Sequence, residues 1–328
     1  MSSGDDPDPS RLYFYTPNKP AAIFFATAFA LAGLAHLWLG FSSKSFRMTS
    51  CLVFGCALLA TAFSTRAILA EDDRNGQVFT ASTMLDYAAP PLMQLANFQI
   101  LGRVFYWVPY FAPMHPARML LTLGSICAVI ELLTVMGIAF LSNRDLPEVD
   151  LQRGDYMTKG SLVVQLATIG IFYALLGVFH RCCYLAYLTR NQGLVRLLTL
   201  LYTTTALLLG RTIYRMAELF GSPPNPLSSS GDTLPPAVRY EALFYIFDAL
   251  LLLLFALAWL FWHPRLYLPI TSKRYLAQDA KTELAGPGWA DSRSLTETFL
   301  NPFATLTARA GHQRPFWEHN GYELQRRR

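Results

Sequence analysis

Seven long apolar stretches constrain the fold of this chain more than any other feature of its sequence. Each reaches about 20 residues, the length that an α-helix needs to cross the hydrocarbon core of a bilayer. They occupy residues 21–41, 48–70, 83–107, 118–141, 160–180, 194–221 and 237–262. Only helices and closed barrels satisfy their backbone hydrogen bonds within lipid, and the alternating pattern of barrel strands is missing. The sequence therefore predicts an all-α membrane protein, a seven-transmembrane-helix bundle.

The segments outside these stretches define the expected domain organisation. Hydrophobic residues make up 53% of the chain and charged residues 15%, and the charges are segregated rather than scattered. Residues 1–20 are acidic and rich in proline, unlike a cleavable signal, and are expected to form an extracellular N-terminal segment. Residues 21–262 form the predicted seven-transmembrane-helix domain, and residues 263–328 a cytoplasmic tail that is largely disordered. The loop at residues 222–236 is rich in Pro, Ser and Gly and should be irregular.

Charges in the loops predict the orientation in the membrane. With the N-terminus outside and the C-terminus cytoplasmic, the inner segments contain nine Lys and Arg residues and the outer segments seven. The positive-inside rule favours this orientation by that small margin. Acidic residues are found in the outer loops and not in the short inner ones, although carboxylates weigh little in the rule. The basic inner face suits anionic lipid better than nucleic acid, so no nucleic-acid partner is expected.

Two polar stripes lie within the last two apolar stretches. Ionisable groups are costly at membrane depth, so such residues usually carry a function. The stripes consist of Arg211, Tyr214, Arg215 and Glu218, followed by Glu241, Tyr245 and Asp248. Their spacings of three and four place each set on one face of a helix. If the two helices run antiparallel, residues at equal depth pair Arg211 with Asp248, Tyr214 with Tyr245 and Glu218 with Glu241.

Other polar residues lie in the third and fourth stretches. Pro90 and Pro91 are expected to kink or unwind the third helix, with Asp86 near its outer end and Gln94 deeper. Broken helices often mark transport sites; the alternative is a packing kink with Asp86 wetted at the interface. Glu131, near the middle of the fourth stretch, is a further functional candidate.

The expected interior charges are two arginines against four carboxylates, Glu131, Glu218, Glu241 and Asp248. If all were ionised, this excess of carboxylates would favour a cation or bind protons. The alternative is a structural ion-pair lock that holds the sixth and seventh helices together.

The sequence offers little for catalysis or for a cofactor. Four histidines map toward the inner face and raise the idea of a metal-dependent membrane hydrolase. No two of them have the spacing of a ligand pair on one helix, and no carboxylate lies near them. There is also no lysine within a span and no glycine-rich phosphate loop. We therefore expect no enzyme, no catalytic residue, no metal and no cofactor.

The last two stretches resemble a known family. They read Gly210-Arg-Thr-Ile-Tyr-Arg-Met-Ala-Glu218 and Tyr240-Glu-Ala-Leu-Phe-Tyr-Ile-Phe-Asp248, and His263-Pro264 follows. This is similar to the fungal lipid-translocating exporters, seven-span proteins related to an aminosterol-resistance protein, with Arg-Ser-x-Tyr-Arg-x-x-Glu, then Glu-x-x-x-Tyr-x-x-Asp, then His-Pro. The chain resembles a divergent member, because the second span has only Arg66 where the family usually adds a Glu and Gly-Tyr, and the fourth has Glu131 where the family usually has Asp.

The resemblance implies a transporter of amphipathic lipids at the plasma membrane, or at another endomembrane, that confers stress resistance. Sphingoid long-chain bases and toxic amphiphiles are the implied substrates, and membrane lipids or amphipathic small molecules are the implied partners. The oligomeric state is left open, with a homo-oligomer as one alternative. In this reading the four carboxylates bind the polar head or protons, Arg211 and Arg215 tune them, and Tyr214 and Tyr245 supply hydrogen bonds. The alternatives are a seven-transmembrane receptor or stress sensor, suggested by the basic inner loops and long tail, and a transporter of porphyrins or other amphiphiles.

Overall fold

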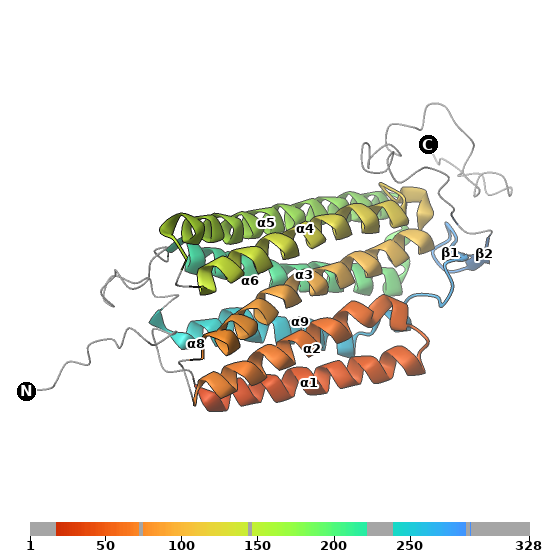
Figure 1. Ribbon diagram of the computed structural model, residues 1–328. Helices are drawn as coiled ribbons and strands as arrows, with labels where there is room; N and C mark the ends of the chain where they lie inside the picture. The colour runs from red at the N-terminus through yellow and green to blue at the C-terminus, as the bar shows by residue number, and fades with distance from the viewer. Residues whose placement is uncertain (1–17, 72–74, 144–145, 222–238, 287–288, 290–328) are drawn as a thin grey trace, which may run out of the picture.

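The computed structural model describes residues 18–71, 75–143, 146–221, 239–286 and residue 289. Most of this part is helical, and the helices lie roughly side by side in one elongated bundle (Figure 1). They are α1 (Lys19–Ser42), α2 (Phe46–Leu69), α3 (Gly76–Trp107), α4 (Pro116–Ser142), α5 (Glu148–Leu185), α6 (Gln192–Gly221), α8 (Glu241–Phe244) and α9 (Leu250–Phe261). Consecutive helices pack against each other, and α9 packs against α6 and α1.

Six helical segments are long and apolar enough to cross a membrane. They are Lys19–Ser42, Phe46–Leu69, Pro116–Ser142, Glu148–Leu185, Gln192–Gly221 and Glu241–Leu266. Their outward faces carry large apolar side chains such as Leu31 and Trp38, which are 67% and 75% exposed. Exposed apolar surface on this scale indicates contact with lipid. The chain is therefore a multi-pass membrane protein.

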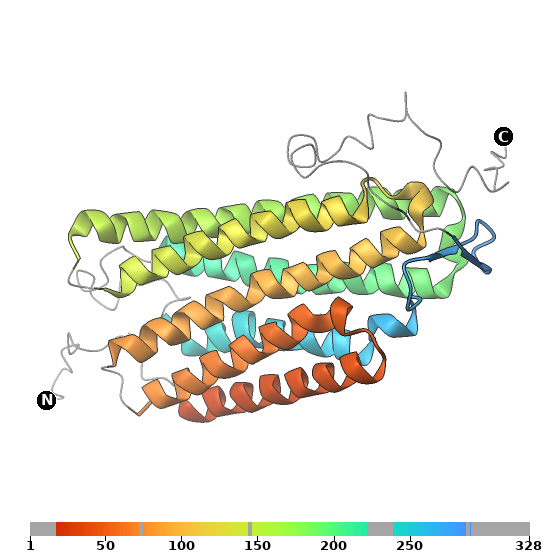
Figure 2. The ribbon, with the colours of Figure 1, turned by 45° about the vertical axis from the view of Figure 1, so that its right-hand side comes forward.

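Helix α3 is not among those six, although it has 32 residues and runs along the bundle between the others (Figures 1 and 2). Polar side chains lower its hydropathy, and the bundle buries Asp86, Gln94 and Asn97. Of the kink or unwinding expected at Pro90 and Pro91, the unwinding is wrong, because the α-helix continues through both residues. Surrounding helices bury both prolines, so tertiary packing holds the helix together there.

Helix α5 begins at Glu148, well before the expected start at residue 160. Most of the loop expected at residues 142–159 is therefore helix. Pro147 stands at its N-cap position, and acidic residues occupy its first turn, where they favour a helix start through the helix dipole. A close approach to α4 supports it, since a Cβ atom on Gly154 would lie only 2.9 Å from the carbonyl oxygen of Gly137.

The last membrane helix is not regular. It starts at Glu241 and changes at residues Tyr245–Ala249 into a π-helical turn, after which α9 continues. Such turns insert one residue into a helix and are frequent at functional sites. Asp248 lies in this turn. The expected segment 222–236 and residues 237–238 lie outside the described residues.

The first part of the expected tail of low order, after Pro264, contains regular structure. Strands β1 (Arg274–Leu276) and β2 (Glu283–Ala285) form an antiparallel hairpin with Tyr275 opposite Leu284. The hairpin lies at the opposite end of the bundle from the start of α1 (Figure 2). Tyr275 is buried, and Arg103 of α3 donates hydrogen bonds to the carbonyl oxygens of Pro269 and Ile270 at 2.9 and 3.0 Å. Residues 290–328 lie outside the described part.

Candidate functional site

The two predicted polar stripes meet inside the bundle. Arg211 of α6 forms an ion pair with Asp248 of the π-helical turn, as predicted from the spacing, and their side chains are 1% and 0% exposed. Arg211 lies ten residues before the end of α6 at Gly221, or about 15 Å along the helix. The pair is therefore deep within the span.

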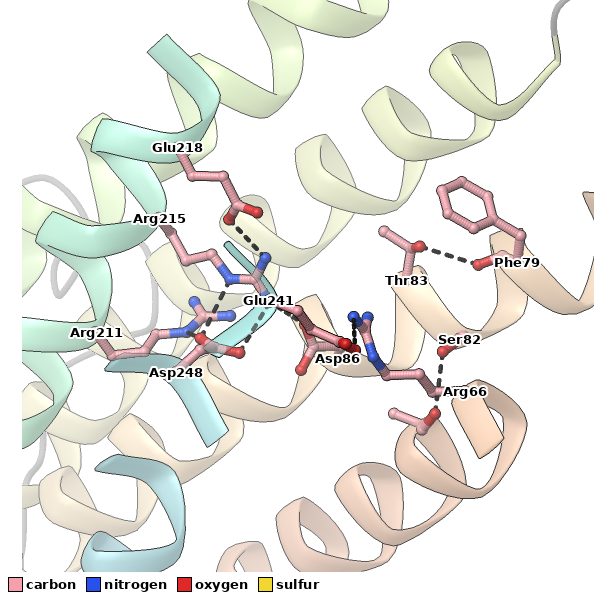
Figure 3. A network of polar contacts seen from close by, with 11 residues as sticks. Arg66, Phe79, Ser82, Thr83, Asp86, Arg211, Arg215, Glu218, Glu241 and Asp248 are labelled. Carbon is pink, nitrogen blue, oxygen red and sulfur yellow. Dashed lines mark hydrogen bonds and ion pairs between the residues drawn. The ribbon is translucent and has the colours of Figure 1, made fainter. Parts of the chain in front are cut away.

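Arg215 is the centre of this ionic network. Its guanidinium donates to Asp248 Oδ2 at 2.8 Å and to Glu218 Oε2 at 2.8 Å, and it also binds Asp86 of α3. Figure 3 shows these side chains converging from three helices. A guanidinium presents five N–H donors in a fixed fork, so it can bind several carboxylates at once. Arg215 thus connects α3, α6 and the last membrane helix.

A third arginine and Glu241 form the part of the network nearest the start of α1. Arg66 Nη2 of α2 lies 3.1 Å from Glu241 Oε1 (Figure 3). The backbone N–H of Asn18 donates to Glu241 Oε2 at 2.9 Å, and the Tyr245 hydroxyl donates to the Asn18 carbonyl oxygen at 3.4 Å. Glu241 therefore ties the start of α1 and the end of α2 to the last membrane helix. We call this end of the bundle the Asn18 end.

The predicted equal-depth pairs are only partly reproduced. Arg211 and Asp248 pair, whereas Glu218 and Glu241 enter the network through arginines. Tyr214 stacks on Phe247 with ring centroids 5.9 Å apart, and Tyr245 stacks on Phe25 at 5.4 Å. The π-helical turn changes the register of the last helix, so the equal-depth pairing expected of two regular antiparallel helices does not hold along its whole length.

Aromatic rings cover the cations of the network. The guanidinium carbon of Arg215 lies 4.7 Å from the centre of the Tyr87 ring and 5.0 Å from that of Phe244. Phe244 also lies 4.3 Å below the guanidinium of Arg66. Cation–π contacts of this kind strengthen when water is excluded. One ring, Phe244, therefore links the two ends of the network.

The network contains three arginines and four carboxylates, which gives it a formal charge of minus one. Two of its buried atoms, Asp86 Oδ1 and Arg211 Nη2, have no hydrogen-bond partner among the described residues. Buried polar atoms without partners are costly and mark places where water or a ligand can bind. The arrangement can therefore accept a further polar group.

Glu131 stands apart from these ion pairs. It lies on α4, and its Oε1 atom is buried without a hydrogen-bond partner among the described residues. Arg211 is the arginine close enough to interact with it electrostatically. Both side-chain polar atoms of Gln94, which is 1% exposed, lack partners in the same part of the chain. Buried polar atoms without partners are therefore also present on α3 and α4, outside the ion pairs.

A second buried polar cluster lies further along α3. The side-chain oxygen of Asn97 accepts a hydrogen bond from Trp259 Nε1 of α9 at 2.9 Å, and its amide nitrogen donates to Thr205 of α6 at 3.2 Å. This cluster has its partners on the same two helices as the ionic network. It fixes α3 against them at a second depth.

Sequence reasoning missed Arg66, Asp86 and Tyr87 as members of the network. One of the two alternatives placed Asp86 in water at the interface, but it is 7% exposed and bound to Arg215. Its position beside the buried proline pair, four residues before Pro90, was the available signal. No three His, Cys, Asp or Glu side chains are grouped to hold a metal ion in the described ranges.

Comparisons with known proteins cover most of these residues. The family model described as RTA1 like protein matches residues 52–271, which include every ionic residue of the network. A protein of Leptosphaeria maculans named lipid-translocating exporter-like protein RTA1 is 33% identical over 299 residues, covering 88% of this chain and 57% of the relative. A protein of the same name from Ajellomyces capsulatus is 27% identical, covering 82% of this chain and 86% of the relative. No solved structure matches the chain.

Proposed function

Because the chain belongs to the RTA1-like family, we propose that it translocates amphipathic lipids across a membrane. Two relatives carry the name lipid-translocating exporter-like protein, and the chain spans little more than half the length of the first. The observation that carries the proposal is the buried ionic network, because a lipid-facing bundle gains little from burying seven charged side chains unless they handle a polar group.

The polar headgroup would bind by exchanging ion-pair partners. An ammonium group that takes the place of an arginine keeps Asp248 or Glu241 paired, so no carboxylate is left uncompensated in the membrane interior. Arg215 suits this exchange best, because it binds three carboxylates and keeps two of them when one is taken over by the ammonium group. The network is therefore suited to passing a cation between carboxylates in small steps.

The roles of single residues follow from this scheme. Glu218, Glu241 and Asp248 would bind the headgroup in turn. Arg211 and Arg215 would hold Glu218 and Asp248 in place, and Arg66 would hold Glu241. Tyr214 and Tyr245 would supply hydrogen bonds beside them. Glu131, with its unpartnered oxygen, would bind the headgroup or a proton on the α4 side.

We place α3 as the seventh span, since 32 residues of helix extend about 48 Å, more than a bilayer core. Seven passes put the start of α1 and the hairpin on opposite sides, consistent with their positions at opposite ends of the bundle (Figure 1). The slight excess of basic residues at the hairpin end supports a cytoplasmic C-terminus. The plasma membrane is the proposed location.

Transbilayer movement in vesicles tests the proposal. Purified protein would be reconstituted into vesicles, and the movement of labelled sphingoid base, phospholipid and porphyrin compared with that in protein-free vesicles. Faster movement of the base supports lipid translocation, and faster movement of the porphyrin alone would instead support the alternative amphiphile. If none moved faster, a receptor or sensor role would replace this proposal.

A further inference from the structure

An open hollow of about 470 Å³ lies at the Asn18 end, at the seam between the first and last membrane helices. Its polar wall is formed by Asn18, Glu241 and Tyr245, and its apolar wall includes Phe24, Phe25 and Ile246. Phe24 is 60% exposed and Ile246 is 48% exposed, so the apolar wall continues onto the lipid-facing surface. A polar base joined to an apolar, lipid-facing wall is the shape that an amphiphile requires.

The charges around the hollow select the headgroup. Glu241 contributes a carboxylate, and none of the described side chains that line the hollow is basic. Arg66, which pairs with Glu241, has a side chain only 8% exposed. A carboxylate offers about four acceptor positions, so Glu241 can receive a donor beyond Asn18 and Arg66. The Glu241 carboxylate would therefore repel an anionic headgroup, whereas it would form an ion pair with a cationic headgroup.

Aromatic rings add to this preference. Phe25 and Tyr245 stack at 5.4 Å with an angle of 8° between their planes, and both line the hollow. The faces of such rings attract alkylammonium groups through their quadrupole. The hollow adjoins the network through Glu241, whose partner Arg66 rests on Phe244, the ring that lies beside Arg215.

We propose that this hollow is a lateral docking site at which a single-chain alkylammonium amphiphile passes between the bilayer and the ionic network. The ammonium group binds Glu241, and the chain lies over Phe24 and Ile246. As a step in transport the inference rests on the proposed function, but docking can be measured separately from movement.

Photolabelling tests the site. Full-length protein in nanodiscs of neutral phospholipid would be labelled with a C16 alkylamine that carries a diazirine near its headgroup, and with the matching alkyl sulfate. The labelled peptides would be mapped with and without excess unlabelled alkylamine. Competable labelling around Phe24 and Ile246 by the amine, and not by the sulfate, is expected. Equal labelling by the sulfate, or amine labelling that does not compete, would overturn the proposal.

A pair of variants provides the control. Ala242 lines the hollow and is exposed, so Ala242→Trp should fill it and lower competable labelling about tenfold, equivalent to about 1.4 kcal/mol of binding. Ala217 is exposed on α6 away from the hollow, and Ala217→Trp should leave the labelling unchanged. Undiminished labelling in Ala242→Trp would reject the site.

Transport in vesicles containing the same variants separates the two claims. If the proposed function and the docking site are both correct, movement slows in Ala242→Trp alone. Unchanged movement in Ala242→Trp would refute the docking step and leave the proposed function standing. Competable labelling at the hollow without movement in the wild type would refute the proposed function and leave the site standing.

Discussion

Replacing Asp248 with asparagine should destabilise the protein strongly. The side chain of Asp248 is fully buried and binds both Arg211 and Arg215. Arg215 would keep Asp86 and Glu218 as partners. Arg211 would lose the carboxylate that binds it in the described part of the chain, and its charge would stay buried. The cost of the substitution therefore comes mainly from Arg211.

The expected loss is about 3 kcal/mol. Removing one partner of a buried ion pair typically costs about 3–5 kcal/mol, because the other charge is left uncompensated. Helices that separate within a membrane find other polar partners, which favours the lower end of that range. Glu218→Gln is the matched control: its side chain is 23% exposed and Arg215 keeps two carboxylates, so the loss should stay below about 1 kcal/mol.

Reversible unfolding by SDS in mixed micelles, followed by tryptophan fluorescence, measures both variants. The double variant Arg211→Gln with Asp248→Asn removes the stranded charge and should recover most of the lost stability. The reasoning is refuted if Asp248→Asn unfolds within about 1 kcal/mol of wild type. It is also refuted if the double variant is no more stable than Asp248→Asn alone.

Three further substitutions probe other parts of the structure. Glu241→Gln should weaken the hydrogen bond from the Asn18 N–H and speed amide hydrogen exchange at the start of α1. Unchanged exchange would contradict the role of Glu241 in holding the start of α1. Gly154→Ala should lower the stability by about 1–3 kcal/mol, because the new Cβ would clash with the Gly137 carbonyl oxygen. Gly170→Ala is the control, since a Cβ there has open space and the stability should not fall. Equal thermal unfolding of the two variants would contradict the close approach of α4 and α5. Asn97→Leu should cost about 1–3 kcal/mol and shift the fluorescence of the indole that it binds, and an unshifted spectrum would count against that hydrogen bond.

Hydropathy predicted the membrane helices well and their ends poorly. The apolar signal stops where lipid ends, but a helix can continue into water, as α5 does between Glu148 and residue 160. The π-helical turn at Tyr245–Ala249 has no hydropathy signature, because inserting one residue leaves the composition unchanged. The hairpin after Pro264 was missed for a related reason. Its strands are only three residues long and gain their burial from contact with the bundle.

The ionic network was predicted in part. Arg211 and Asp248 could be paired because each belongs to a set of polar residues at helical spacing, which defines a face and a depth. Arg66 is the single charge in its expected span, and Asp86 shares its span only with the distant Arg103, so neither belongs to a set of polar residues that defines a face. Their partners depend on how α2 and α3 cross the last helices, which the sequence alone does not specify. The family comparison supports a membrane lipid transporter, and the binding roles of these residues remain a proposal.

The most direct test of the central claim compares lipid movement per folded molecule in wild type and in the Arg211→Gln, Asp248→Asn double variant. Both proteins would be reconstituted at equal folded amounts, and the transbilayer movement of labelled sphingoid base measured. If the network handles the headgroup, the double variant folds nearly as well as wild type and moves the lipid no faster than protein-free vesicles. Equal rates per folded molecule would show that the ion pairs only hold the helices together.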